Sequence, residues 1–158
     1  MATHPDARPR LSESLACGIG CLTPQKRRAW VKRGVLPDWD AKGGFTELQV
    51  IQITVVRVLH DALGPHGAKV AWSEIEKDLL QGILQPRLDL VIDVDRLRCH
   101  LVRSDQELAL AVRTTVCLRV IPLAEEIAEA RLAFQRHWRA LPSGGRASRR
   151  GESASESA

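Results

Sequence analysis

The spacing of apolar residues changes about halfway along the chain. Up to about Gly82, apolar residues recur three and four positions apart, which is typical of helices with one buried face. From about Leu88 onward they recur at every second position, which is typical of half-buried β-strands. Helices followed by strands, without a regular alternation of the two, predict an α+β fold.

The clearest helix of the first half is a short one from Pro24 to Arg33. Thr23 supplies a hydroxyl that can cap the free N–H groups of the first turn, and proline is preset for the first helical position. Gly34 suits the end of this helix, because glycine tolerates the left-handed conformation found there. A weaker helix from Leu11 to Cys17 is expected before it.

A loop and two further helices complete the first half. Residues 37–44 contain Pro, two Asp and a Gly pair, and predict a turn or a small wing. A longer helix is then expected from Thr46 to about Leu63, and the Gly-Pro-His-Gly sequence at 64–67 should break it. Ser73 begins a Ser-x-x-Glu capping box, which predicts another helix over residues 74–81.

The second half predicts a small antiparallel β-hairpin or meander and a final helix. Apolar residues alternate over 88–94 and then on the opposite parity up to Leu101, so a turn or bulge is expected at Asp95-Arg96. From Leu108 to Val120 they keep one parity throughout, which predicts one more strand.

Pro122 then begins a helix from Leu123 to about Arg139, whose apolar residues lie near heptad spacing. This helix is short for an independent coiled coil, so it either forms a dimer seam or covers the sheet. Residues 83–141 are therefore interpreted as a β-rich module with a helix, for self-association or partner binding.

The two ends differ from the rest of the chain in composition. Residues 1–10 read as a flexible tail, and residues 142–158 contain no large apolar side chain and should be disordered. The start of the chain lacks a signal-peptide core, and no apolar run approaches the length that spans a bilayer. We therefore expect a cytoplasmic protein without a membrane partner, whose cysteines are reduced thiols.

Positive charge is concentrated on the short helix at 24–33. The chain has a formal net charge of +4 and a pI near 9.2, which favours a polyanionic partner without establishing one. The helix carries a run of cations that no acidic residue interrupts, so they need solvent or an external anion. These cations are Lys26, Arg27, Arg28, Lys32 and Arg33. On charge alone, a solvated basic face explains them as well as a nucleic acid does.

The residue pattern around this helix resembles the head of the MerR family and its excisionase-like relatives. The sequence at 22–24 is Leu-Thr-Pro, where the family begins its recognition helix with a hydrophobic residue, Ser or Thr, and Pro. Arg28 and Trp30 stand where the family has an arginine and an aromatic residue, and Gly-Val-Leu-Pro at 34–37 resembles the closing Gly-Leu-Leu-Pro. The resemblance covers residues 11–81, about half of the chain.

The resemblance implies a winged helix-turn-helix domain over residues 11–82 that binds double-stranded DNA. The second helix would enter the major groove, with Gln25, Lys26 and Arg28 reaching bases or phosphates, and the wing would touch the backbone. The residues that would mainly hold the DNA backbone are Thr23, Arg27, Lys32, Arg33 and Lys42.

Three features depart from the family pattern. Arg27 stands where the family prefers an apolar residue. The expected wing is short and carries Asp38 and Asp40, so Lys42 is its only good phosphate ligand. A typical family member continues into one long dimerisation helix, whereas this chain first continues into strands.

We therefore expect a sequence-specific DNA-binding regulator of transcription, working as a homodimer because a single small head makes few base contacts. Two alternatives use the same residues differently. One is an architectural DNA-binding protein, such as an excisionase or the recognition subunit of a phage packaging machine. The other is a protein-interaction adaptor whose head does not bind DNA, which the acidic loop would favour. The sequence names no effector.

Catalysis, cofactors and metals are not expected. The sequence contains no glycine-rich phosphate loop and no nucleophile motif, and its histidines are scattered. Cys17 and Cys21 are four residues apart without a Cys-x-x-Cys motif, which favours small buried thiols over a metal site. Asp89, Asp93 and Asp95 alternate, which is typical of a solvated strand face.

Overall fold

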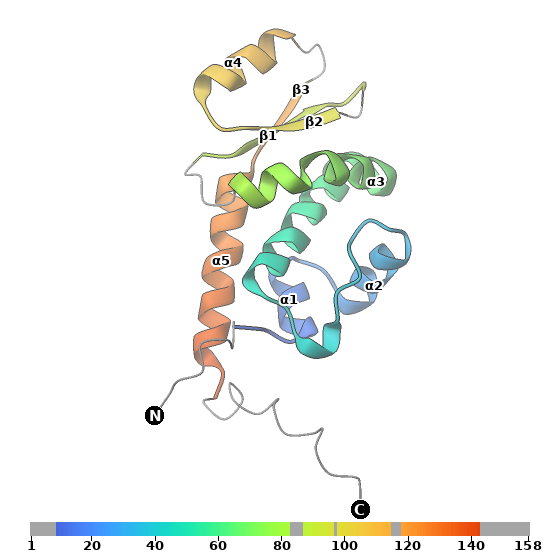
Figure 1. Cartoon of the computed structure of the whole chain (residues 1–158), viewed down its shortest axis with the longest axis vertical. Coiled ribbons are helices and arrows are strands. Elements are labelled where there is room, and N and C mark those ends of the chain that lie inside the picture. Colours follow the sequence, from blue (N-terminus) through green and yellow to red (C-terminus); the bar gives the residue numbers. More distant parts are fainter. Residues whose placement is uncertain (1–8, 83–86, 97, 115–117, 143–158) are drawn as a thin grey trace, which may run out of the picture.

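A computed structural model describes residues 9–82, 87–96, 98–114 and 118–142 of the chain. In chain order its elements are α1 (Glu13–Ile19), α2 (Pro24–Lys32), the 3-10 helix η1 (Ala41–Gly43), α3 (Glu47–Gly82), β1 (Asp89–Asp93), β2 (Arg98–Val102), α4 (Asp105–Thr114), β3 (Leu118–Pro122) and α5 (Leu123–Ala140). Helices combined with an antiparallel sheet confirm the α+β class. Figure 1 shows α1 and α2 beside the first half of α3, with the sheet and α4 at the other end of the molecule.

The predicted break in the third helix is a kink inside one long element. Gly64 has a positive φ of 75° and ψ of 179°, a conformation that favours glycine, and Pro65 follows it at the start of the next helical part. The helix predicted to begin at residue 74 is therefore wrong in its start. Ser73 lies inside α3, where its hydroxyl donates to the carbonyl of Val70 at 2.7 Å instead of capping a terminus.

The sheet has the order β2-β1-β3, with both pairings antiparallel. β1 and β2 form the predicted hairpin, and the side chain of Asp93 accepts a hydrogen bond from the backbone N–H of Arg96 at 3.1 Å in its turn. Leu90 on β1 pairs with Leu101 on β2 and with Ile121 on β3. Asp89 is buried and ion-paired with Arg87 at 3.1 Å, so at this position the predicted solvated face is wrong.

The strand predicted from Leu108 to Val120 is wrong over its first half, because residues 105–114 form α4. Ser104 caps α4, because its Oγ accepts from the Glu107 N–H at 3.2 Å. Glu107 Oε2 accepts from the Arg103 N–H at 2.7 Å, one residue before the cap. In the helix Leu108 and Ala111 share the face that packs on the sheet. β3 spans Leu118–Pro122, and residues 115–117 of the predicted strand lie outside the described residues.

The sheet separates two hydrophobic clusters. The larger one runs from the helices of the first half through one face of the sheet to α5, and the smaller one lies between the other face and α4. α5 buries Leu123, Ile127 and Phe134 against this larger cluster. It is also tied to α3 by the ion pairs Arg131–Glu47 at 2.6 Å and Arg57–Glu126 at 2.8 Å.

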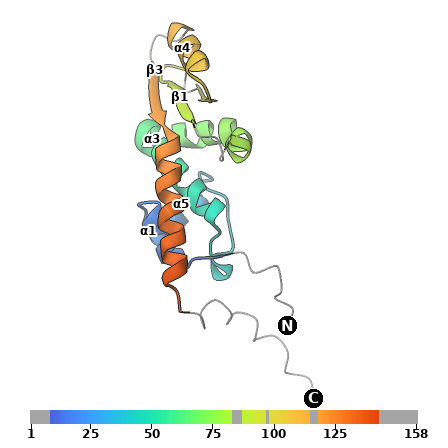
Figure 2. The same ribbon diagram turned by 90° about the vertical axis from the view of Figure 1, so that its left-hand side faces the viewer.

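α5 therefore packs along α1 and α3 (Figures 1 and 2). The sequence had predicted that this helix belongs with the β-rich module. In Figure 2 its other face lies uncovered along the front of the molecule. Within the described residues, no helix has the length and apolar character needed to cross a membrane.

Candidate nucleic-acid interface

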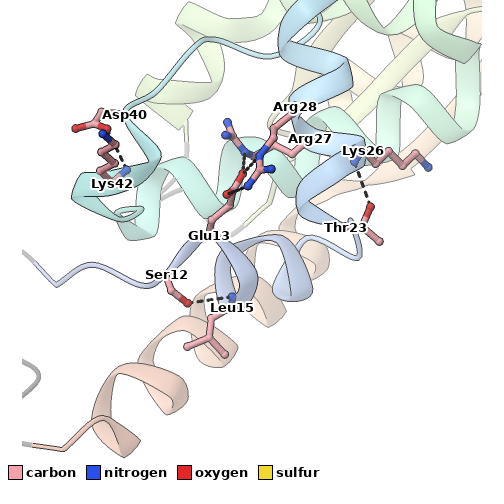
Figure 3. Close-up of polar contacts among 9 residues, drawn as sticks. All are labelled: Ser12, Glu13, Leu15, Thr23, Lys26, Arg27, Arg28, Asp40 and Lys42. Atoms are coloured by element: carbon pink, nitrogen blue, oxygen red, sulfur yellow. Dashed lines mark hydrogen bonds and ion pairs between the residues drawn. The ribbon is translucent and has the colours of Figure 1, made fainter.

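The helix predicted from Pro24 to Arg33 is present as α2, and its two ends are capped as expected. Thr23 Oγ1 accepts a hydrogen bond from the Lys26 backbone N–H at 3.1 Å (Figure 3). At the other end Gly34 has a φ of 68°, and its N–H donates to the Val31 carbonyl at 2.9 Å. The Val35 N–H donates to the carbonyl of Trp30 at 2.9 Å, which completes a Schellman motif. Fixed ends hold this short helix in place.

One side of α2 is buried and the opposite side is exposed. Arg27 and Trp30 are buried, and Val31 is half-buried beside them. Three and four residues make about one helical turn, so Gln25, Arg28 and Lys32 share the opposite face, where all three are exposed. Lys26 and Arg33 are exposed as well, and α2 carries no acidic residue.

Trp30 anchors α2 to α3. Its ring stacks on His60 with the centroids 4.5 Å apart and the planes at 26°. On the outer side, the ammonium of Lys26 lies 5.3 Å from the Trp30 ring centroid, within the range of a cation–π contact. Trp30 is thus a buried core residue, and Lys26 has a defined position at the edge of the exposed face.

Glu13 of α1 binds two arginines of α2 (Figure 3). Its Oε1 accepts from Arg27 Nε at 2.9 Å and from Arg28 Nε at 3.3 Å, and its Oε2 accepts from Arg28 Nη2 at 2.8 Å. The hydrogen bonds from Arg28, together with Arg27, lower the pKa of Glu13 although burial opposes this. In return, Glu13 raises the pKa of Arg28. Sequence reasoning missed Glu13, because its partners lie 14 and 15 residues away with no local pattern to connect them.

Arg27 does not fit its expected role as a phosphate ligand, because its side chain is only 4% exposed. Its guanidinium carbon lies 5.1 Å from the Phe45 ring centroid, and its Nη1 has no hydrogen-bond partner. The aliphatic stem thus fills the position that the MerR pattern gives to an apolar residue, while Glu13 compensates the charge. The set of available cations on α2 is reduced to Lys26, Arg28, Lys32 and Arg33.

The loop expected to form a wing contains η1 and one isolated bridge, not a β-hairpin. Asp40 caps η1 by accepting from the Lys42 N–H at 3.0 Å, and the bridge joins Leu11 to Phe45. Lys42 is exposed, but Figure 3 shows it on the other side of the Glu13 cluster from Lys26. The structure therefore keeps Lys42 apart from Lys26, and residues 37–46 contain a 3-10 helix and one isolated bridge where a wing was expected.

Lys69 of α3 adds a cation that the sequence did not predict. Its Nζ lies 3.3 Å from the place where a side chain at Gly34 would put its Cβ. An exposed ammonium therefore stands over the C-terminal end of α2, where the helix dipole favours positive charge. Together with Arg33, Lys69 extends the basic surface beyond the helix.

The three cysteines that the structure describes are free thiols with different exposure. Cys17 and Cys99 are buried, and burial raises the pKa of Cys17 to about 11 and that of Cys99 to about 12. Cys21 is exposed, so the burial expected for this thiol is wrong, and Cys117 lies outside the described residues. Across the part of the chain that the structure describes, no three His, Cys, Asp or Glu side chains are grouped to hold a metal ion.

Comparison of the chain with protein-family models, curated protein sequences and solved structures found no match. The resemblance to the MerR family therefore rests on the residues of α2 and its flanks. The function has to be argued from the capped helix, its exposed cations and its surroundings.

Proposed function

We propose that this protein is a sequence-specific double-stranded DNA-binding regulator of transcription, and that the exposed face of α2 enters the major groove. The observation that carries the proposal is a helix capped at both ends, with an exposed face that bears cations and no acid. Its opposite face is anchored by Trp30 on α3. A rigid, basic, uncovered helix has the dimensions and charge that the groove accepts.

The exposed side chains divide into two kinds of contact. Gln25 lies in the first turn, the part of a recognition helix that reaches base edges, and its amide suits adenine N6 and N7. Lys32, Arg33 and Lys69 gather toward the C-terminal end of α2, where they suit backbone phosphates. Binding of phosphates releases counterions, so affinity should fall steeply with salt.

An adaptor role has less support than the loop sequence suggested. The acidic residues of the loop were the main support for an adaptor, but one of them, Asp40, caps η1. An architectural role would use the same face of α2, so it makes the same prediction for DNA binding and differs in the genes affected.

The test is selection of bound sequences from random DNA, followed by affinity measurements at several salt concentrations. Arg33→Ala should lower affinity for all sequences and reduce the slope of log K against log salt by about 1. Arg113→Ala is the matched control, because Arg113 is exposed on α4 at the other end of the molecule. Gln25→Ala should change the selected sequence. Absence of binding at low salt, or equal effects of Arg33→Ala and Arg113→Ala, would overturn the proposal.

We also propose that the protein acts as a homodimer through the outward face of α5 (Figure 2). Leu132 is 60% exposed at the centre of this face, opposite the buried stripe that includes Ile127 and Phe134. Glu129 precedes Leu132 and Arg136 follows it, and neither forms an ion pair with a described residue. When two copies of α5 pack antiparallel about Leu132, the Glu129 of each copy lies next to the Arg136 of the other.

Charge reversal tests this dimer. Glu129→Arg and Arg136→Glu each replace attraction by repulsion at both symmetric contacts, so each should shift the mass in sedimentation toward the monomer. The double variant restores opposite charges and should restore the dimer. A wild-type protein that stays monomeric, or single variants with unchanged association, would contradict the proposed interface.

A further inference from the structure

We infer that Glu13 positions Arg28 so that Arg28 reads a guanine base in the DNA site, and that Arg28 is not primarily a phosphate ligand. The inference rests on the proposed function of α2. It assigns a specificity-determining residue and a positioning residue that the sequence pattern did not separate from the other cations.

The contact between Glu13 and Arg28 leaves one end of the guanidinium available. A guanidinium has five N–H donors, and Glu13 takes the Nε donor at 3.3 Å and one Nη2 donor at 2.8 Å. This side-on contact leaves the two donors of Nη1 and the second donor of Nη2, with no hydrogen bond to another described residue. Nη1 and Nη2 together form the fork that binds O6 and N7 of guanine.

The arginine remains accessible while it is held. The Arg28 side chain is 64% exposed and lies on the same face as Gln25 and Lys32. A side chain that is already oriented loses less conformational entropy when it binds, and its fork has a defined direction. Preorganisation of this kind favours one geometry, as a base edge requires, over the many positions from which a phosphate can be reached.

The charge distribution points the same way. Glu13 compensates part of the positive charge of Arg28, whereas Lys32 and Arg33 have no acidic residue on α2 beside them. A neutral base edge is bound through directed hydrogen bonds, so it tolerates this compensation better than a phosphate does. Arg28 therefore reads a base edge, whereas Lys32 and Arg33 bind phosphates of the DNA backbone.

Glu13 is itself held in place. Arg27 donates to the same Oε1 from a buried position over the Phe45 ring. The backbone of Glu13 lies in the first turn of α1, which Ser12 caps by accepting from the Leu15 N–H at 3.4 Å. Because the Glu13 carboxylate has a fixed place on α1, it can hold the exposed guanidinium of Arg28 in one orientation.

The first test compares Arg28→Lys with wild type in selection of bound DNA. Lysine keeps the charge but lacks the planar fork. We expect a guanine preference at one position of the wild-type site that weakens by about 5- to 150-fold in Arg28→Lys. Affinity for unrelated DNA should change by less than about 2-fold, because the phosphate contacts remain. Arg113→Lys makes the same change at an exposed arginine of α4, at the other end of the molecule, and should leave the guanine preference intact.

The second test isolates Glu13 from its role beside buried Arg27. Glu13→Gln is introduced into a chain that already carries Arg27→Met, so that no buried guanidinium loses its partner. We expect Arg27→Met to keep a guanine preference, because Arg28 still binds Glu13, and we expect this preference to fall when Glu13→Gln is added. The fall should be absent when Arg28→Lys is also present. Thermal unfolding of each variant verifies that the fold persists.

Three outcomes distinguish a failure of the roles given to Arg28 and Glu13 from a failure of the proposed DNA binding. Wild-type protein that binds DNA but selects the same bases as Arg28→Lys overturns the inference and leaves the proposed function standing. A full guanine preference in the Glu13→Gln, Arg27→Met chain overturns the positioning role of Glu13. Failure of wild-type protein to bind DNA at low salt overturns the proposed function and the inference with it.

Discussion

Replacing Glu13 by Gln should destabilise the fold much more than replacing its buried partner Arg27 by Met. In wild type, the buried guanidinium of Arg27 has the Glu13 carboxylate beside it at 2.9 Å and the Phe45 ring at 5.1 Å. Glu13→Gln removes the negative charge and leaves Arg27 charged in a buried place. Arg27→Met removes the buried charge itself, fills most of the same volume and leaves Glu13 bound to exposed Arg28.

The expected magnitudes differ because of this asymmetry. Loss of one partner from a buried ion pair costs about 3 to 5 kcal/mol, and we expect the lower end because Glu13 keeps 14% of its exposure. Replacement of a buried charge by an apolar residue of similar volume is often neutral, so Arg27→Met should cost less than about 1 kcal/mol. The double variant should resemble Arg27→Met, so the coupling free energy equals the cost of Glu13→Gln, about 3 kcal/mol.

Urea unfolding followed by circular dichroism measures these free energies at pH 7. The pH dependence gives a second measure, because the pKa of Glu13 in the folded protein lies below its ordinary value of 4.5. Stability from the carboxylate is complete above pH 4.5 and is lost as the pH falls through the lowered folded pKa. The difference between wild type and Glu13→Gln should therefore shrink at acidic pH.

Two results would refute this reasoning. One is a Glu13→Gln protein less than about 1 kcal/mol below wild type, since a buried unpaired arginine costs more than that. The other is an Arg27→Met protein destabilised as much as Glu13→Gln, which would mean that the arginine is stabilising in its own right. A difference that does not depend on pH below 4.5 would contradict the assignment to the carboxylate.

Three further predictions concern the turn after α1, the cap of α2 and the thiols. Gly20→Ala should cost about 1 to 3 kcal/mol in unfolding free energy, because its Cβ would lie 2.5 Å from Cγ2 of buried Ile53. Thr23→Ala should cost about 1 kcal/mol in the same measurement through loss of the cap on α2. Native protein should react with a maleimide at exposed Cys21 far faster than at the two buried thiols, as mass spectrometry measures. The buried thiols are Cys17 and Cys99.

Each of these has a control within the chain. Gly18→Ala meets no atom within 4 Å and should stabilise α1, so a loss equal to that of Gly20→Ala would contradict the packing argument. Ser14→Ala removes an exposed hydroxyl of α1 and should be nearly neutral beside Thr23→Ala. Labelling is read in a Cys117→Ser background, and rapid reaction of the buried thiols without denaturant would show that the core opens.

The elements that the sequence predicted well are those set by local chemistry. The bounds of α2 follow from Thr23-Pro24 at one end and Gly34 at the other, and each signal acts within one turn. The hairpin turn after Asp93 and the kink at Gly64 are local in the same way. Where a cap, a turn or a positive φ decides the structure, neighbouring residues suffice to predict it.

The strand predicted over α4 shows where periodicity misleads. Alternating apolar residues indicate a strand, yet in the helix Leu110 and Val112 remain 64% and 52% exposed. The Ser-x-x-Glu sequence that begins at Ser104 was the available signal for the helix. The same motif at Ser73 predicted a helix start that does not exist, because α3 already runs through it. Tertiary context decides which capping motif is used.

The candidate site was predictable only in part, because tertiary contacts also decide which of its cations are exposed. The exposed cations follow from the charge pattern of α2, but the burial of Arg27 depends on where α1 and Phe45 pack. Likewise, Lys69 reaches the end of α2 from the far side of the kink in α3. Contacts between residues distant in sequence leave no mark in the spacing of one helix.

The junction between β3 and α5 has a mechanical consequence for the whole molecule. β3 ends at Pro122 and α5 begins at Leu123, so no flexible residue separates them, and the Ala124 N–H binds the Leu88 carbonyl at 3.1 Å. From this joint α5 extends about 27 Å, at 1.5 Å for each of its 18 residues, and contacts α1. One inserted residue would rotate the buried stripe by about 100°. Because α5 follows β3 without a linker and packs on α1 and α3, a rotation of the sheet would also move α5 against these helices. The number of residues at the junction is therefore as constrained as their identity.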